Sequence, residues 1–331
     1  MLLEKYVSTL RPGDVFRDWL VYIMDDRISN KRCDVRVYKV APASHTVCRY
    51  EFVGENYGVV AKFYAEPTGC RRDYDPVKSM ETEFSALTKT AQVIDVPKPI
   101  AMRKDFNCVL VTENIHGNTL YRYMETEKDL YDKLTAVAQI LRRLHGGTKS
   151  MYRKQEEFAH FHKVLDQLRL DNSTRKKYDR ILGDWWYSTL VDLPYGCRIH
   201  NDANPANYIF SHDKIYAIDF ESSWEHASFI HDLGIMAAEL KHYFAIHKNN
   251  EEKAEPYIGH FLWQYSKSEE EFHRITKTLP FFMALGFFRM ARLGVDRDQN
   301  AYIFRKATDC LKAIYLNGKS KRTLSWTQED L

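Results

Sequence analysis

Two aspartates and an asparagine stand close together between residues 200 and 221, at spacings that phosphoryl transfer can use. Asn207 follows Asp202 by five residues, and a short apolar run then leads to Asp219. Transfer of a γ-phosphoryl group needs a base that orients the attacking hydroxyl, and it needs oxygen ligands for Mg²⁺. We therefore expect Asp202 to act as the base, and Asn207 and Asp219 to bind the metal ion.

The two short motifs that hold these residues, His-Asn-Asp and Ile-Asp-Phe-Glu, resemble the catalytic and metal-binding loops of the protein-kinase-like superfamily. Glu221 stands where protein kinases have glycine, which favours the small-molecule branch of aminoglycoside phosphotransferases and choline kinases. Asn201 replaces the glycine that is usual in that branch. The resemblance implies that His200 supports the loop by packing and hydrogen bonding, and that Glu221 assists without ligating the metal.

Three runs of alternating apolar residues precede these loops and predict an antiparallel meander. They cover residues 34–40, 46–53 and 58–64. Lys62 lies inside the third run, where its ammonium is costly unless a carboxylate or phosphate pairs with it. A lysine that only extends to the strand edge is the alternative. A helix expected at 77–90 carries Glu83, and the resemblance implies that Lys62 and Glu83 form the ion pair that positions the phosphates of ATP. Glu81 is the competing partner.

Further nucleotide contacts are expected in two loops. In place of a glycine-rich loop, Ala-Pro-Ala-Ser-His separates the first two runs. The Ser44 hydroxyl and nearby amides could reach a phosphate there, with an ordinary hairpin turn as the alternative. Another predicted strand pair ends near Glu113. The resemblance implies that the backbone from Glu113 to Ile115 hydrogen-bonds the adenine edge, before Gly117 releases the chain into a second lobe.

The remainder of the chain is predicted to be mainly helical. Residues 132–145 show the stripe of an amphipathic helix, and His145 at its end is more typical of a structural than of a catalytic residue. Asp232 opens a later helix, and the resemblance implies that it holds the backbone of the catalytic loop, with a helix N-cap as the alternative. Residues 2–25 are expected to form a short helical lead-in.

The composition bounds the class of protein. A chain of 331 residues with 44% hydrophobic residues can bury two cores. Its 48 basic and 45 acidic residues give a net charge of +3, so no overall field favours nucleic acid or an anionic membrane as a partner. The six cysteines lack a metal-binding spacing, and no segment reaches ~20 apolar residues. We therefore expect a cytoplasmic protein with free thiols.

Together with these patterns, the resemblance implies an α+β, bilobal, protein-kinase-like fold. The expected N-lobe is a small antiparallel sheet with a helix at residues 1–115, and the larger helical C-lobe at residues 116–331 carries the catalytic and metal loops and the acceptor site. The leading hypothesis is transfer of a phosphoryl group from ATP, with Mg²⁺, to a hydroxyl of a small molecule such as a sugar, an amino alcohol or an aminoglycoside-like compound.

Two alternatives remain for the function. A catalytically silent pseudokinase usually lacks the lysine, the catalytic acid or the metal acid, whereas Lys62, Asp202 and Asp219 are all present. A protein kinase is disfavoured by Glu221 and by the missing Ala-Pro-Glu segment. The sequence does not identify the acceptor, the choice between ATP and GTP, or the oligomeric state.

Overall fold

The computed structural model describes residues 3–41, 43–67, 74–212, 214–293 and 297–317. The described chain divides into two compact units, each built from two segments. The first contains Met1–Lys128 and Ala206–Ser223, and the second contains Asp129–Pro205 and Trp224–Leu331. The lobe boundary expected between residues 115 and 116 remains a prediction, since these units are defined by compactness and are divided at other positions.

A six-stranded antiparallel sheet forms the centre of the first unit, in the order β1-β2-β3-β4-β6-β5. Its strands are β1 (Leu3–Leu10), β2 (Val35–Ala41), β3 (His45–Phe52), β4 (Gly58–Pro67), β5 (Pro99–Arg103) and β6 (Val109–Glu113). The predicted meander corresponds to β2, β3 and β4, which pair antiparallel without a crossover, and the β3–β4 register shifts once, between His45 and Thr46. Alternating apolar side chains give each of these strands one face for the core.

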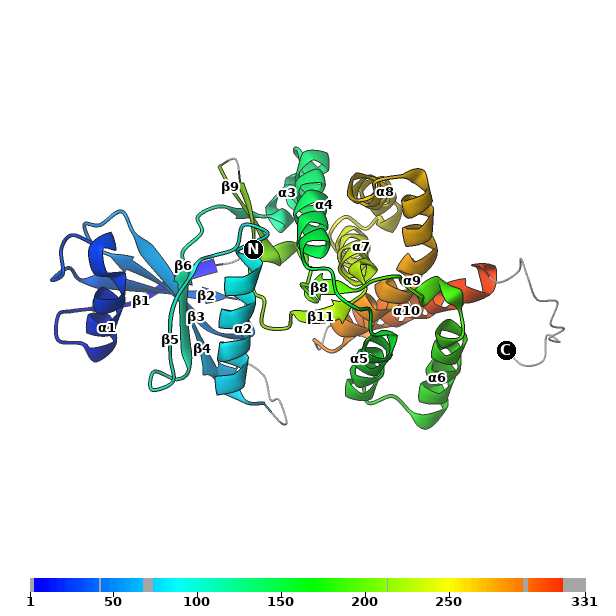
Figure 1. Ribbon diagram of the computed structural model, residues 1–331, viewed down its shortest axis with the longest axis horizontal. Helices are drawn as coiled ribbons and strands as arrows, with labels where there is room; N and C mark the ends of the chain where they lie inside the picture. The colour runs from blue at the N-terminus through cyan, green and yellow to red at the C-terminus, as the bar shows by residue number, and fades with distance from the viewer. Residues whose placement is uncertain (1–2, 42, 68–73, 213, 294–296, 318–331) are drawn as a thin grey trace. The chain divides into compact units, whose positions relative to one another are not determined.

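The two faces of this sheet carry different helices (Figure 1). Helix α1 (Val15–Met24) packs its apolar side against a core that includes Val59 and Ala61 of β4. Successive side chains of a strand point to opposite faces, so Lys62 and Tyr64 face away from that core. Helix α2 (Pro76–Thr90) contacts β4, β5 and β6, and its Glu83 meets Lys62 and Tyr64.

The N-terminal lead-in differs from the prediction of one short helix. Residues 3–10 form β1, which pairs antiparallel with β2, and only the following segment is helical. Side chains 4–7 of this edge strand are exposed, so no apolar alternation identifies the strand in the sequence. The Pro12-Gly13 pair marks the turn, where Gly13 has a φ of +96°, and Asp14 caps the helix by accepting from the Arg17 amide.

A small sheet with the order β10-β9-β7 completes the first unit. Its strands are β7 (Asn118–Thr119), β9 (Tyr208–Ser211) and β10 (Lys214–Ala217), and α3 (Leu120–Thr126) follows β7 directly. Of the short helices, η1 (Asp25–Arg27) follows α1, and η3 (Pro205–Asn207) begins at the last residue of a second-unit segment. Gly117 precedes β7 and lies against β9. A Cβ at this position would meet the Phe210 carbonyl oxygen at 2.2 Å, so only glycine fits here.

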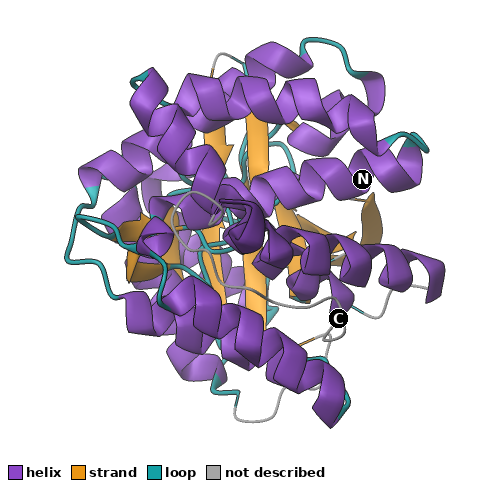
Figure 2. Cartoon of the chain, turned by 90° about the vertical axis from the view of Figure 1, so that its right-hand side faces the viewer, coloured by secondary structure: helices purple, strands orange, loops and turns teal. Residues whose placement is uncertain are grey.

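The second unit is mainly helical, and helices dominate the view in Figure 2. Its helices are α4 (Leu130–Gly147), α5 (Lys154–Gln167), α6 (Asn172–Trp186), η2 (Thr189–Val191), α7 (Phe229–His247), η4 (Glu251–Lys253), α8 (Ala254–Tyr265), α9 (Glu269–Ala291) and α10 (Arg297–Asn317). A two-stranded sheet pairs β8 (Cys197–Ile199) with β11 (Trp224–Ala227). Gly234 of α7 allows close packing on α9, because a Cβ there would lie 2.3 Å from the Cβ of Phe282.

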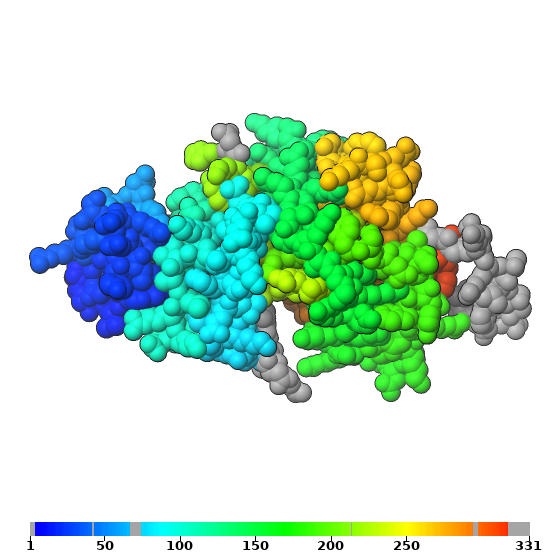
Figure 3. Space-filling view, viewed as in Figure 1, coloured from blue at the N-terminus to red at the C-terminus, as the bar shows by residue number. Residues whose placement is uncertain are grey.

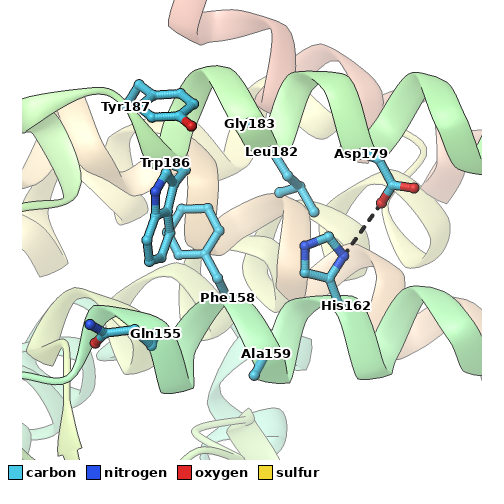
Figure 4. Close-up of a pocket in the computed structure, with 9 residues that line it drawn as sticks. All are labelled: Gln155, Phe158, Ala159, His162, Asp179, Leu182, Gly183, Trp186 and Tyr187. Carbon is cyan, nitrogen blue, oxygen red and sulfur yellow. Dashed lines mark ion pairs between the residues drawn. The ribbon is translucent and has the colours of Figure 1, made fainter.

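A groove of about 440 Å³ lies between α5 and α6, which form the green surface at the lower right of Figure 3. Phe158 and Trp186 line it, and His162 pairs with Asp179 across it at 3.4 Å (Figure 4). None of the site residues predicted from the sequence lines this groove. The chemistry expected from the motifs therefore lies elsewhere in the two units.

Two further findings concern the described residues only. None of their helices has both the length and the apolar character needed to cross a membrane. The cysteines among them, Cys33, Cys48, Cys108, Cys197 and Cys310, are free thiols. Cys70 lies outside the described residues.

Candidate active site

Lys62 is the centre of a buried charge cluster in the first unit. Its Nζ donates to Glu83 Oε2 at 3.0 Å and to Asp219 Oδ1 at 2.6 Å, and it lies 3.0 Å from Glu221 Oε2. Only 12% of the Lys62 side chain is exposed, so it does not extend to the strand edge. Tyr64, two residues along β4, also donates its hydroxyl to Glu83. The structure thus pairs the strand lysine with the helix glutamate and with the predicted metal acid.

Glu81 does not join this cluster. Half of its side chain is exposed, and it pairs with Lys104 at 3.3 Å. Glu83 is 5% exposed, because α2 turns this position toward β4. Of the two candidates, Glu83 is therefore the partner of Lys62 in the structure.

Glu221 connects the cluster to His45, the first residue of β3. His45 Nε2 lies 2.8 Å from Glu221 Oε2, and the histidine side chain is fully buried. The loop that precedes β3 was expected to contact phosphate through Ser44. The structure shows Ser44 half-buried in a bend directly before β3, one residue from His45. The hydrogen bond between His45 and Glu221 therefore connects this turn to the motif that carries Asp219.

The charges of the cluster shift the pKa values of its members. Burial disfavours the Lys62 charge, but Asp219 and Glu83 outweigh it and hold the Lys62 pKa well above its ordinary value. Burial raises the pKa of Asp219 to about 6 against the opposing charge of Lys62, with Glu83 and Glu221 acting in the same direction as burial. Burial also disfavours the Glu221 charge, but the hydrogen bond from His45 and the charge of Lys62 outweigh it and lower the Glu221 pKa.

Asn207 stands at the base of the hairpin that ends in Asp219. It closes η3 directly before β9, and its carbonyl accepts a hydrogen bond from the Ile218 amide at 3.0 Å. The register of β9 and β10, in which Tyr208 opposes Ala217, continues through this bond. The hairpin therefore brings the backbone of Asn207 beside the residue that precedes Asp219, and their role as joint ligands of one ion remains a prediction.

Asp202 lies in the second unit, in the loop after β8. Arg289 of α9 donates through Nη2 to Asp202 Oδ1 at 2.8 Å and also donates to the Asn201 carbonyl. Asn204 donates its side-chain amide to the other carboxylate oxygen, Oδ2, at 3.0 Å. About a third of the Asp202 side chain (33%) remains exposed, so the carboxylate is oriented and still accessible.

Asp232 holds the backbone of the same loop. Its carboxylate accepts from the His200 amide at 2.7 Å and from the Asn201 amide at 2.9 Å. His145 contributes a third bond at 3.0 Å through Nε2. Ser228, and not Asp232, caps α7. Asp232 is completely buried; burial alone would raise its pKa, but the hydrogen bond and charge of His145 outweigh that effect and lower it.

The backbone of Asn201 explains how asparagine can take the place of glycine in the His-Asn-Asp motif. Its φ is +63°, in the left-handed region that glycine adopts freely and that asparagine tolerates better than most residues. Asp219 also has a positive φ, of +65°. Both loops therefore turn at left-handed residues with short polar side chains.

A comparison with known proteins now identifies the family. A model of the phosphotransferase enzyme family (APH) matches residues 47–255, which is more than half of the chain. The chain belongs to this family. It is accordingly a kinase that transfers a phosphoryl group to an alcohol acceptor on a small molecule. No curated protein matches it in sequence.

Solved structures give the fold of this family member. The chain is similar to an ethanolamine kinase of Plasmodium vivax, with 13% identity and a TM-score of 0.61, over 92% of this chain and 90% of that chain. A choline/ethanolamine kinase family protein of Mesorhizobium loti gives 14% identity and a TM-score of 0.61, over 92% and 99%. The streptomycin-ATP-APH(2")-IIa ternary complex gives 13% and 0.56, over 91% and 98%. These similarities confirm the predicted α+β protein-kinase-like fold.

The expected adenine contacts lie at the end of β6. The Glu113 amide donates to the Lys98 carbonyl at 2.9 Å, so within this segment that N–H is already used. Ile115 follows in the half-buried connection to β7. A hydrogen bond with adenine would therefore use the Glu113 carbonyl and the Ile115 backbone. This contact remains a prediction.

Sequence reasoning missed two residues that contact the predicted site. Arg289 lies in an aromatic stretch of α9 whose sequence pattern is typical of a buried core. His45 ends a short segment whose sequence is typical of a hairpin turn. Arg289 is an isolated polar residue between apolar neighbours, the same signal that identified Lys62, whereas His45 stands between Ser44 and Thr46 and gives no such signal. Their partners, Asp202 and Glu221, are distant in the sequence and carry no pattern that points to them.

Replacing Asp232 with alanine should strongly destabilise the second unit. Two backbone amides and His145 would lose their buried acceptor, and breaking such a buried pair costs about 3–5 kcal/mol. Chemical unfolding of Asp232→Ala beside wild type measures this loss. Asp132→Ala, which removes an exposed carboxylate from α4, is the control and should change little. A loss below about 1 kcal/mol for Asp232→Ala would contradict the role assigned to Asp232.

The same residue predicts a pH dependence. Because its folded-state pKa is depressed, ionised Asp232 contributes stability above the ordinary carboxyl range, and this contribution is lost as the pH falls below about 3.9. Wild type should therefore lose stability more steeply than Asp232→Asn on acidification below that pH. Equal slopes for the two proteins would contradict the assigned direction.

Proposed function

We propose that the protein transfers the γ-phosphoryl group of ATP, with Mg²⁺, to a hydroxyl group of a small molecule. The observation that carries the proposal is the ammonium of Lys62, held in a buried site between Glu83 and Asp219. Burying a lysine together with two carboxylates carries a large desolvation free energy. It is also the arrangement by which a kinase positions the phosphates of its nucleotide. The ATP in the streptomycin-ATP-APH(2")-IIa complex supports the choice of nucleotide.

In the first unit, the residues around Lys62 would bind the nucleotide. Lys62 contacts the phosphates and Glu83 fixes its direction, with Tyr64 holding Glu83 from the other side. The turn with Ser44 offers a hydroxyl and backbone amides to the phosphates. The backbone between Glu113 and Ile115 would hydrogen-bond the adenine edge without the help of a side chain.

The donor set of the first unit fits Mg²⁺. Carboxylate oxygens of Glu83, Asp219 and Glu221 lie within 4.8 Å of one another, and the ammonium of Lys62 stands among them. The excess negative charge and the hard oxygen donors match what Mg²⁺ prefers. Asp219 and Asn207 would hold the ion, with Glu221 and His45 keeping the Asp219 loop in place. When bound, the ion supplies positive charge against the phosphate oxygens.

Asp202 would receive the proton of the acceptor hydroxyl. Arg289 and Asn204 hold its two oxygens, and Asp232 fixes the loop backbone on which it stands. A carboxylate so oriented can align the hydroxyl and accept its proton as the phosphoryl group transfers. The chain reaches Asn207 five residues later, so the acid and the metal-binding carboxamide belong to one loop.

Removal of the Lys62 ammonium should lower turnover and weaken phosphate positioning. In Lys62→Ala, kcat/KM for ATP should fall by about 10²-fold or more, as when one transition-state donor is lost. Lys62→Arg should not restore it, because a planar guanidinium cannot replace a compact ammonium among three carboxylates. Steady-state ADP release checks both, with Lys39→Ala on the exposed side of β2 as the control. Full activity in Lys62→Ala would remove Lys62 from the mechanism.

An acceptor screen tests the function itself. Sugars, polyols, hydroxy acids, amino alcohols and aminoglycosides are each incubated with the protein and Mg-ATP. We expect acceptor-dependent ADP release and a product heavier by one phosphoryl group. ADP release that is independent of any acceptor would indicate hydrolysis, and no turnover at all would favour a catalytically silent nucleotide-binding protein.

A further inference from the structure

Three of the buried ring nitrogens in the second unit that lack a hydrogen-bond partner among the described residues lie close together. They are Nε2 of His160, Nε2 of His231 and Nε1 of Trp224. The three rings form one cluster, with centroid distances of 6.0 Å for His160 to Trp224, 5.7 Å for His160 to His231 and 6.3 Å for Trp224 to His231. Buried polar atoms are nearly always paired, so three in one cluster indicate that a polar molecule meets them.

This ring cluster lies beside the loop that carries Asp202. Trp224 on β11 pairs with Ile199 on β8, the strand that leads directly into that loop. His231 immediately precedes Asp232, whose carboxylate holds the loop backbone. The cluster is therefore attached from two sides to the segment that presents the catalytic acid.

The hydrogen-bonding roles in the cluster suit a hydroxyl group. His231 Nδ1 lies 2.9 Å from Glu157 Oε2, and the other Glu157 oxygen accepts from the Ser228 amide at 2.6 Å. A carboxylate only accepts, so His231 Nδ1 carries a proton, and Nε2 is left to exchange a hydrogen bond with a ligand. Trp224 Nε1 can only donate. A hydroxyl both donates and accepts and satisfies both atoms, whereas a protonated amine would leave the indole N–H unpaired.

The electrostatic surroundings of the ring cluster disfavour a positively charged acceptor. Burial, and then the charges of His231, Arg289, Arg292 and Lys163, lower the pKa of His160 to about 3. The carboxylates of Glu157 and Asp232, which interact with His231, are engaged by His231 and by His145 respectively, and Asp202 is paired with Arg289. The same basic groups that keep His160 neutral would oppose a cationic acceptor beside it.

Building on the function proposed above, we propose that His160, Trp224 and His231 bind the acceptor through its hydroxyl groups. The acceptor is a sugar, polyol or hydroxy acid that carries no positive charge. A site with unpaired carboxylates would instead select positively charged amines.

Matched acceptor pairs test the charge preference. Glucose is compared with glucosamine, ethylene glycol with ethanolamine, and glycolate with choline, each with Mg-ATP and with product mass as the readout. The uncharged or anionic member should have the larger kcat/KM, by roughly tenfold or more. Efficient transfer with preference for the amines overturns this inference and leaves the proposed function standing. Transfer to no member of any pair contradicts the proposed function and, with it, the inference.

Trp224→Phe tests the ring cluster directly, because it keeps one aromatic ring and removes the pyrrole ring with its N–H. KM for the best hydroxyl acceptor of the panel should rise by roughly tenfold, while KM for ATP and the melting temperature stay unchanged. The acceptor-dependent change in tryptophan fluorescence, measured without ATP, should also be lost. Trp263→Phe on α8, where the side chain is 53% exposed, is the matched control and should retain both. A lowered melting temperature with an unchanged acceptor KM would make Trp224 structural and overturn the assignment.

Discussion

Asp202→Asn should lower turnover by about 10²- to 10⁴-fold while binding of Mg-ATP survives. Asparagine keeps the size of the side chain and could still hydrogen-bond Arg289, but it cannot accept a proton from the acceptor. The residues that would hold the nucleotide and the metal lie in the other compact unit and are unchanged. An ADP-release assay and calorimetry with Mg-ATP on the same two preparations measure both parts of this expectation.

The alternative roles of Asp202 give different results in these assays. A catalytically silent protein would show no transfer in wild type and no change in the variant. A purely structural aspartate would lose nucleotide binding together with melting temperature when replaced. Asn204→Ala, which removes the amide that holds Asp202 Oδ2, serves as an intermediate variant and should reduce turnover less than Asp202→Asn. Retained turnover in Asp202→Asn would exclude it as the base.

Asp219→Ala should abolish the magnesium-dependent part of nucleotide binding. In wild type, we expect ATP to raise the melting temperature weakly without a divalent ion and strongly with Mg²⁺, because Asp219 and Asn207 would reach the phosphates through the ion. Without Asp219 the difference between the two conditions should disappear. Thermal unfolding with ATP alone and with Mg-ATP measures it, and Asp105→Ala, an exposed acid of the same unit, should behave as wild type.

The pH provides a second test of the same residue. With a pKa of about 6, Asp219 is protonated in a growing fraction of molecules as the pH falls below that value. A protonated carboxyl is a poor metal ligand, so the Mg²⁺-dependent stabilisation by ATP should weaken on acidification through pH 6 in wild type. Equal stabilisation of Asp219→Ala and wild type by Mg-ATP would refute the metal assignment.

The sequence predicted those parts of the fold that depend on local patterns. Alternation identified β2, β3 and β4, because each strand turns one face to a core that includes Val59 and Ala61. It failed for β1, an edge strand whose exposed side chains show no apolar alternation. The spacing of Asp202, Asn207 and Asp219 was informative, because one loop and one hairpin carry all three.

Contacts between distant segments were beyond the sequence. His45 and Glu221 are 176 residues apart, and Asp202 and Arg289 are 87 apart. No period or motif connects such positions, since their contact follows from tertiary packing alone. The choice between Glu81 and Glu83 was open for a related reason. Both lie on α2, and only its packing on β4 decides which one is buried beside Lys62.

The central claim is that this chain moves the terminal phosphoryl group of ATP to a hydroxyl. Terminally radiolabelled ATP, supplied with Mg²⁺ and a mixture of sugars, polyols and hydroxy acids, tests it most directly. The label should appear in one or more acceptors as a phosphate ester with wild type and with Lys39→Ala, and at least about 10²-fold more slowly with Asp202→Asn. Label found only in inorganic phosphate, or transferred equally by Asp202→Asn, would contradict it.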